Sequence, residues 1–255
     1  MKLERKKVLI TGASSGLGRG LAVELARAGN DLVITARREE LLAEVTREAE
    51  GFGAKCIAVA ADATDEAAAE AVVNAGIEAF GHLDLAILNA GGGTAGSMAE
   101  FSAAEVKRIM RTNYDTMVNF LCPMIQHMKA PGRGGVIAYT GSPAGTFGLP
   151  KSGPYSAAKA AGRTLFDTCR IELADSGIRF VALYPGFTDT PGLDPNDVPV
   201  KGLIISSERA VKEMMGAIAR EEEHFMFPAT IRTAIALGRA LPEPLRRRIL
   251  GLAAD

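Results

Sequence analysis

The chain has 255 residues, of which 47% are hydrophobic and 23% charged, so it is long enough to bury one large core. No linker or change of composition divides it, which predicts a single domain over residues 1–255. The formal net charge is −1 at pH 7, and basic residues are scattered along the chain. The chain therefore lacks the net positive charge that is typical of proteins that bind nucleic acids or anionic membranes. Small molecules are the expected ligands.

Cysteine usage and apolar length indicate the compartment. Cys56, Cys122 and Cys169 are odd in number and far apart, without metal-ligand spacing, so we expect reduced core cysteines and no metal site. The start MKLERKKVLI has an apolar run too short for a secretion signal, and no other stretch approaches a membrane span. We therefore expect a cytoplasmic protein without a transmembrane segment.

Apolar runs alternate with stretches of helical periodicity along the whole chain. The runs are KVLIT, DLVITA, KCIAVAAD, LDLAILNAG, GGVIAYTGS and IRFVALYPG, and the helical stretches are 18–29, 38–50, 65–80, 102–128 and a helix beginning near Pro154. Short, nearly all-apolar strands between helices predict a parallel sheet covered on both faces. The expected fold is therefore α/β and doubly wound, with three layers and about seven strands.

Ligands of doubly wound sheets bind beyond the carboxyl ends of the strands. The segments that follow the predicted strands are 12–18, 36–38, 62, 89–91, 142 and 185–190, and many of their residues are small or polar. We expect a cofactor groove at this edge.

The segment TGASSGLG places Gly12, Gly16 and Gly18 between a strand and a helix. Glycines here let backbone N–H groups and the positive helix N-terminus approach a pyrophosphate. A glycine-rich turn without a ligand is the alternative. The segment is not a P-loop, because Arg19 and Gly20 stand where Lys and Ser/Thr are required.

The second strand ends with Ala36, Arg37 and Arg38. An acidic residue at this place usually binds the ribose hydroxyls of NAD, whereas a guanidinium favours a 2′-phosphate. The pattern therefore favours NADP(H) over NAD(H), although two solvated surface arginines are the alternative interpretation.

Two further strand ends carry polar residues. Asp62 is placed to accept from an adenine amino group or to cap the next helix, and division of these two roles between Asp62 and Thr64 is a further alternative. Asn89 ends the fourth strand in LNAG, where glycines allow close approach of the backbone to a cofactor.

The segment SGPYSAAKAAG predicts a helix with Pro154 in its first turn and with Tyr155 and Lys159 on one face. A nearby ammonium lowers the pKa of a tyrosine, which would make the pair a usable general acid and base. Ser142 would reach the same edge to bind a carbonyl oxygen, and Asn113, inside the helix 102–128, would hold a water next to Lys159. Each feature taken alone also fits a structural role: Tyr155 and Lys159 could be an exposed helix pair, and Ser142 a turn residue. The context TGSPAG is not the GxSxG of hydrolases.

Together these motifs resemble the short-chain dehydrogenase/reductase family in its compact form, a Rossmann fold, over roughly residues 5 to 205. The resemblance rests on TGASSGLG, NAG at 89–91, Asn113, Ser142, YSAAK and PGFTDT. It implies that Tyr155 exchanges the proton of a carbonyl or alcohol substrate while Ser142 orients the oxygen. It implies also that Lys159 lowers the pKa of Tyr155 and holds the nicotinamide ribose, and that Asn113 supports a relay water.

The resemblance, with the strand ends above, assigns the cofactor contacts. They are Gly12, Ser14, Ser15, Gly16, Leu17, Gly18, Arg37, Arg38, Asp62, Ala63, Asn89, Ala90, Gly91, Tyr155, Lys159, Pro185, Gly186, Thr188 and Thr190. Ser15 stands where NADPH-using members often have a basic residue, so the NADP(H) preference depends on positions 36–38. The expected reaction is reduction of a ketone or aldehyde, with two alternatives: a non-catalytic NADP(H)-binding sensor or assembly protein, and an NAD-dependent alcohol dehydrogenase.

Two segments and the assembly state complete the expectations. Residues 187–207 fall where the family places a substrate lid, and Phe187, Leu193, Val198, Val200 and Leu203 suggest a partly apolar substrate. Residues 229–255 read as a C-terminal extension of two amphipathic helices broken at LPEP, packed on the domain or a partner subunit, or else contacting a lipid-like substrate or a membrane. The family also implies a homodimer or homotetramer, with Ala157, Ala158 and Ala161 small enough for close helix approach; packing of these alanines only within the monomer is the alternative.

Overall fold

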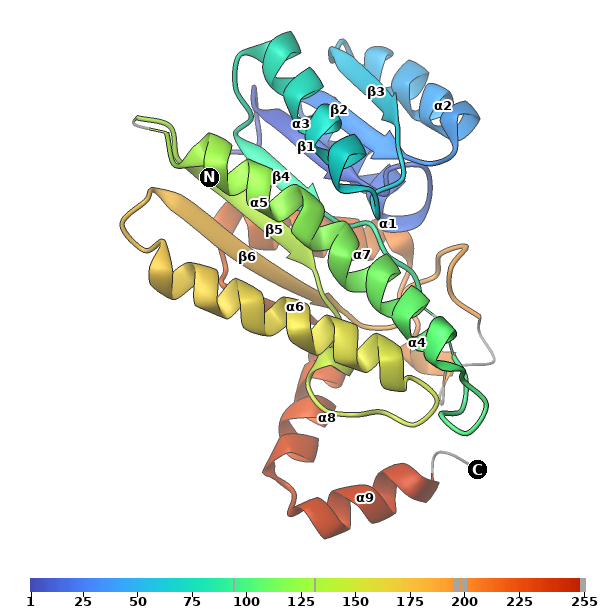
Figure 1. The fold of residues 1–255 in the computed structure, drawn as a ribbon. Coiled ribbons are helices and arrows are strands. Elements are labelled where there is room, and N and C mark those ends of the chain that lie inside the picture. Colours follow the sequence, from blue (N-terminus) through green and yellow to red (C-terminus); the bar gives the residue numbers. More distant parts are fainter. Residues whose placement is uncertain (94, 131, 195–197, 199–200, 253–255) are drawn as a thin grey trace.

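The computed structural model describes residues 1–93, 95–130, 132–194, 198 and 201–252. Its centre is a seven-stranded parallel sheet in the order β3-β2-β1-β4-β5-β6-β7 (Figure 1). The strands are β1 Lys7–Thr11, β2 Asp31–Ala36, β3 Cys56–Ala60, β4 Leu85–Leu88, β5 Gly135–Thr140, β6 Ile178–Pro185 and β7 His224–Phe227. The winding reverses between β1 and β4, which opens a crevice beyond their carboxyl ends.

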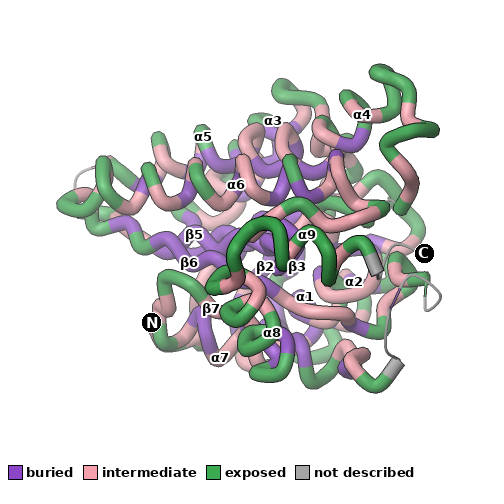
Figure 2. Tube along the Cα trace, turned by 90° about the horizontal axis from the view of Figure 1, so that it is seen from below, coloured by how far each residue is buried: buried purple, intermediate pink, exposed green. Residues whose placement is uncertain are grey.

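Helices cover both faces of the sheet. One hydrophobic cluster joins the sheet to α1 Gly16–Arg27, α2 Glu39–Glu50 and α7 Ser207–Arg220, and a second joins it to α3 Glu66–Phe80, α5 Thr116–Met128 and α6 Gly153–Glu172. Figure 2 shows the buried strands between the two helix layers. The predicted doubly wound α/β fold is confirmed, and α6 begins at Gly153 with Pro154 in its first turn, as the sequence indicates.

The short strand β7, His224–Phe227, was not located among the apolar runs. It pairs with β6 at the edge of the sheet, where His224 is exposed and only Phe227 is buried. An edge strand needs less apolar surface than a central one, so its pattern is weak.

The stretch 102–128 is not one uniform helix, contrary to expectation. The helix α4, Ala103–Met110, starts at a capping box between Ser102 and Glu105, and a π-helical turn, Arg111–Asp115, separates it from α5. A π turn adds a residue to the helix and is frequent at functional sites. Asn113 lies in this turn and is buried.

Two expectations about burial are corrected. Cys56 and Cys169 are buried, but Cys122 is exposed because it lies on the outer face of α5. Ala158 is fully buried inside the monomer, whereas Ala157 is exposed and Ala161 half-buried. Ala158 therefore serves the core of this chain rather than contact between subunits.

The segment predicted as a lid, residues 187–207, is described in part. A parallel bridge joins Thr188 to Ile205, and a 3₁₀ turn spans Lys201–Leu203. Val198 and Ile205 are buried, while Val200 lies outside the described residues. Its role as a lid remains a prediction.

The C-terminal segment forms two helices, as predicted, α8 Ala229–Ala240 and α9 Glu243–Leu252, which extend from the body of the molecule (Figure 1). They are interrupted at Leu241, whose backbone is extended before Pro242. The helix α8 packs against β7 and against the 3₁₀ turn Pro143–Gly145. Among the described residues, no helix is long and apolar enough to span a bilayer.

Candidate active site

The glycine-rich turn brings β1 and α1 into close contact. Gly12 and Gly16 have φ values of +69° and +54°, which glycine adopts without the penalty that other residues incur. A Cβ on Gly18 would lie 2.2 Å from the carbonyl oxygen of Gly12. The side chain of Ser15 makes no cap to α1, so the positive N-terminus of this helix is left open, as a pyrophosphate requires.

The segment after β6 lies against the same turn. A Cβ on Gly16 would lie 3.3 Å from the side chain of Thr190, and Thr188 donates from its hydroxyl to the Gly186 carbonyl over 3.2 Å. Pro185 ends β6, and Leu17 packs partly into the core. The structure therefore brings residues predicted from distant motifs to one edge.

Asn89 links three strands at that edge. Its backbone N–H and that of Ala90 donate to the hydroxyl of Thr11, over 2.9 and 3.0 Å. Its side-chain amide donates to the Thr11 carbonyl and accepts from the Thr140 hydroxyl. The sequence analysis missed Thr11 and Thr140, although both end strands. Asn89 thus fixes β4 against β1 and β5, which positions Ala90 and Gly91.

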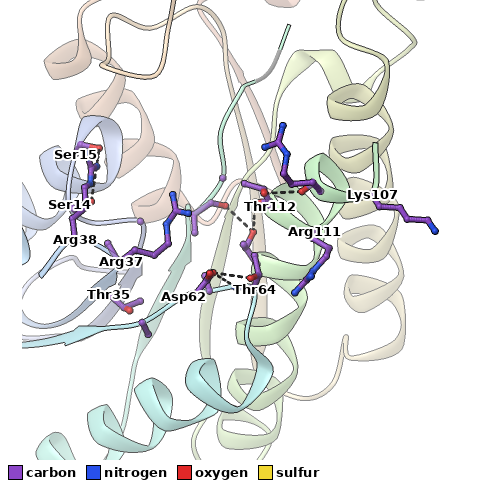
Figure 3. Close-up of a pocket in the computed structure, with 18 of the residues that line it drawn as sticks. Ser14, Ser15, Thr35, Arg37, Arg38, Asp62, Thr64, Lys107, Arg111 and Thr112 are labelled. Carbon is purple, nitrogen blue, oxygen red and sulfur yellow. Dashed lines mark hydrogen bonds between the residues drawn. The ribbon is translucent and has the colours of Figure 1, made fainter. Parts of the chain in front are cut away.

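A groove of about 740 Å³ opens beyond β1, β2 and β3 (Figure 3). Of the predicted cofactor contacts, those that line it are Gly12, Ser14, Ser15, Arg37, Arg38, Asp62, Ala63, Ala90 and Gly91. Ala36 and Thr64, named at the strand ends, line it too, and so do residues that were not predicted from the sequence, namely Thr35, Ala61, Ala104, Lys107, Arg108, Arg111, Thr112 and Thr116. Most of the additional polar residues come from α4 and the π turn. The groove fits an elongated ligand.

Charge in this groove is mainly positive. Arg37 and Arg38 lie on the β2 side, and Lys107, Arg108 and Arg111 on the α4 side, with Asp62 as the acidic residue of the described lining. Lys107 and Arg108 of α4 and Arg111 of the π turn were missed because nothing in their helical pattern shows that this part of the chain passes the groove. A polyanionic ligand would be electrostatically favoured here.

The two arginines after β2 are held differently. Arg38 donates to the hydroxyls of Ser14 and Ser15 over 2.9 and 2.7 Å, so its guanidinium lies against the glycine-rich turn. Arg37 reaches toward the middle of the groove (Figure 3). Arg37 is therefore the better placed of the two for a group on the ribose.

Asp62 does not cap the following helix, and neither does Thr64; both expectations are wrong. The cap of α3 is Asp65, which accepts from the backbone of Ala68. Asp62 instead accepts from the backbone and hydroxyl of Thr64, both over 2.9 Å. The backbone bond from Thr64, then its hydroxyl bond and then the charge of Arg37, keep the pKa of Asp62 below its ordinary value. Asp62 therefore faces the groove as a carboxylate.

Thr35 gives an independent sign of a polar ligand. Its side chain is 1% exposed and lines the groove, and its hydroxyl has no hydrogen-bond partner within the described part of the chain. A buried hydroxyl without a partner destabilises the folded state, by about 1–3 kcal/mol. Together with the glycine cradle and the open start of α1, this unsatisfied group fits a bound dinucleotide.

Ser142, Tyr155 and Lys159 converge beyond β5. Ser142 is buried, accepts from the backbone of Ala144 over 3.2 Å, and interacts with the Tyr155 phenol. The ammonium of Lys159 is 4% exposed, donates to the Thr140 carbonyl over 3.0 Å, and lies 5.7 Å from the Tyr155 ring centroid. The first turns of α6 place both side chains on one face, as predicted.

The expected effect of Lys159 on Tyr155 is not found in this structure. Burial raises the pKa of Tyr155, and Ser142, rather than Lys159, opposes this rise. Burial also lowers the pKa of Lys159 to about 8. Lys159 is almost completely withdrawn from water, and desolvation disfavours its charged form.

Asn113 connects this group with the groove. Its side-chain oxygen accepts from the N–H of Gly92 over 3.1 Å, and its amide donates to the carbonyls of Gly92 and Ile109. A Cβ on Gly91 would lie 2.9 Å from the Asn113 oxygen and 3.5 Å from the Lys159 nitrogen. Gly91, which also lines the groove, is therefore the point at which the two parts of the site meet.

Comparison with known proteins shows the family of the chain. Residues 6–198 match the family described as short chain dehydrogenase. An uncharacterized oxidoreductase of Myxococcus xanthus is 31% identical over 244 residues, which span 96% of each chain.

Two solved structures share the fold. A short chain dehydrogenase/reductase from Burkholderia phymatum in complex with NAD aligns with a TM-score of 0.85 and 25% identity over 94% of both chains. An alcohol dehydrogenase from Thermococcus sibiricus complexed with 5-hydroxy-NADP aligns with a TM-score of 0.77 and 26% identity, over 87% of this chain and 95% of that one. The chain belongs to the short-chain dehydrogenase/reductase family, whose members are oxidoreductases that bind a nicotinamide cofactor.

Proposed function

We propose that the protein is an NADPH-dependent reductase that converts a ketone or aldehyde to an alcohol, reversibly. The observation that carries this proposal is the convergence of Ser142, Tyr155 and Lys159 beside Gly91, at the end of a positively charged groove. A non-catalytic dinucleotide sensor would need the groove but not this buried acid/base group.

The nicotinamide cofactor, when bound, supplies the hydride that the carbonyl carbon receives. The phenol of Tyr155 donates its proton to the carbonyl oxygen, and the Ser142 hydroxyl orients and polarises that oxygen. Lys159 would hold the nicotinamide ribose, the role that does not depend on a shift of the Tyr155 pKa. Asn113 holds the Gly92 backbone, and with it the position of Gly91. In the oxidative direction the proton returns to Tyr155.

The assignment of NADPH depends on this chain's own groove. Ala36 supplies no carboxylate to accept from a ribose hydroxyl, while Arg37 reaches into the groove. Replacing Arg37 with Gln should weaken NADPH binding about 10- to 100-fold, the usual value of a hydrogen bond to a charged group, and leave NADH nearly unchanged. Arg19→Gln, at an exposed residue of α1 paired with Glu48, is the control. Equal losses for both cofactors would overturn the 2′-phosphate assignment.

A Tyr155→Phe variant tests the proposed reaction. It should bind NADPH with wild-type affinity but lose at least about 100-fold in carbonyl reduction, because the proton donor is absent. Tyr114→Phe, which removes a half-buried hydroxyl of the π turn, is the matched control and should remain active. The readout is NADPH oxidation across a panel of aldehydes and ketones. If the wild type binds NADPH yet reduces no compound, the sensor alternative replaces the reductase.

A further inference from the structure

The two C-terminal helices leave large apolar side chains in contact with solvent. Leu237 of α8 is 64% exposed, and Leu245 and Ile249 of α9 are 47% and 48% exposed. Leu245 and Ile249 are four residues apart, so they lie on the same face of α9. Half-buried Arg246 and Leu250 lie on a different face. The apolar stripe of α9 therefore points away from the body of the molecule.

The same helices concentrate positive charge. Residues 229–252 contain five arginines and one glutamate, a formal charge of +4 on a chain whose overall charge is −1. Exposed Arg248 and half-buried Arg246 lie on either side of the apolar stripe, and Arg247 is exposed on the opposite side of α9. The net charge of the whole chain gives no indication of an anionic partner, because acidic residues elsewhere balance this local excess of arginines.

The helix pair lies beside the active-site loop. The guanidinium of Arg246 is 5.6 Å from the ring centroid of Phe147, and a Cβ on Gly238 would lie 3.1 Å from the same ring. Phe147 belongs to the segment that joins Ser142 to Tyr155. Whatever α8 and α9 contact is thus held next to the catalytic group.

We propose that α8 and α9 form a peripheral binding surface for anionic phospholipid membranes. An exposed apolar stripe flanked by arginines is the pattern of helices that lie in the membrane interface, where leucine side chains enter the acyl region and cations meet the headgroups. Because the Phe147 segment joins this surface to Ser142 and Tyr155, the substrate class is an apolar carbonyl compound dissolved in the lipid. This last step rests on the proposed reductase activity, whereas the membrane contact does not.

A second copy of the chain is a less suitable partner for this surface. In a two-fold symmetric dimer the same patch occurs on both sides of the contact. Pairing α9 with its own copy would bring the arginines of the two chains together, and like charges across an interface are repulsive. Anionic headgroups complement the charge instead.

Sedimentation with vesicles tests the surface, using the full-length protein and vesicles of phosphatidylcholine alone or with phosphatidylglycerol. We expect binding to the mixed vesicles that weakens with added salt, and little binding to phosphatidylcholine alone. Arg247→Gln combined with Arg248→Gln should weaken binding on the order of 30-fold. Leu245→Glu combined with Ile249→Glu should weaken it by at least about 100-fold.

Phe52→Glu is the control, because it introduces a glutamate, one of the two negative charges of the double variant, at an exposed apolar residue (43%) of the loop after α2. It should leave vesicle binding unchanged. Absence of wild-type binding to mixed vesicles would overturn the proposal. So would a change in the molar mass of the lipid-free Leu245→Glu/Ile249→Glu protein by light scattering, since the helices would then be a subunit contact.

A kinetic comparison separates membrane contact from catalysis. A long-chain methyl ketone supplied in mixed vesicles should be reduced at least 10-fold more slowly by the Leu245→Glu/Ile249→Glu variant, while reduction of a water-soluble aldehyde is unchanged. If the wild type binds vesicles and reduces the aldehyde but not the ketone, the substrate class is wrong and the membrane surface stands. If it reduces neither compound, the proposed reductase fails independently of vesicle binding.

Discussion

Replacing Lys159 with Met should change how the stability of the nucleotide-free protein depends on pH. Burial lowers the pKa of this lysine from 10.5 to about 8, and the side chain is 4% exposed. Below pH 8 the lysine is protonated in both states, so the folded state carries the full cost of burying an ammonium. Between pH 8 and 10.5 only the unfolded state keeps the proton, and the contribution of Lys159 to stability therefore rises with pH.

The size of the effect follows from the shift. A difference of one pKa unit corresponds to about 1.4 kcal/mol, so the contribution of Lys159 should rise by roughly 3 kcal/mol across this range. Loss of the hydrogen bond to the Thr140 carbonyl adds a constant offset of about 1–3 kcal/mol. Other groups titrate too, such as Cys56, whose pKa burial raises to about 11, but they contribute equally to both proteins.

Urea unfolding at pH 7, 8, 9 and 10 measures the free-energy difference between wild type and Lys159→Met. We expect the free energy of unfolding of the wild type to rise, relative to that of the variant, by about 1.4 kcal/mol per pH unit above pH 8. Lys212→Met, at an exposed lysine of α7, should show no such gain. A free-energy difference that stays constant with pH would refute the argument that burial controls the charge of Lys159.

Three further substitutions test the construction of the site. Gly18→Ala places a Cβ 2.2 Å from the Gly12 oxygen, so it should lower the free energy of unfolding by about 1–3 kcal/mol and remove most of the dinucleotide affinity. The control is Gly216→Ala in α7, where a Cβ meets only the end of a flexible arginine. Equal melting temperatures for the two variants would contradict this prediction. Thr35→Val removes the hydroxyl that has no hydrogen-bond partner in the described part of the chain. Calorimetry should therefore show a more stable nucleotide-free protein, and titration should show weaker dinucleotide binding. An unchanged dinucleotide affinity would exclude a ligand contact of this hydroxyl. Asn89→Ala breaks the bonds that join β4 to β1 and β5 and should cost about 2–3 kcal/mol in urea unfolding; a cost below 1 would show that those bonds are replaced by water.

The sheet and its ligand edge were predictable because their signals are local. Apolar runs such as KVLIT and DLVITA are buried on both faces, and each is followed by the small or polar residues that the edge requires. The strand β7 was not predicted, because this edge strand is exposed at His224 and lacks the continuous apolar pattern.

The partners of several site residues were not predictable in this way. Asp62 was expected to bind or cap, yet Asp65 caps α3 and Asp62 bonds to Thr64. Both carboxylates suit a helix start, and only the backbone geometry selects between them. Asn113 was placed in the correct part of the chain, but the π turn that directs it to Gly92 leaves no signature in the sequence.

The sequence by itself determined the fold class, the glycine-rich turn and the identity of the serine, tyrosine and lysine, because these depend on residue type and short spacing. Only the tertiary structure decided which groups face each other across the site. Arg111, far from Arg37 in the chain, lines the same groove, and Lys159 is desolvated beside Tyr155. The charge and burial of a site arise from the packing of segments that are distant in the chain. The residue pattern of one segment does not predict which other segments pack against it.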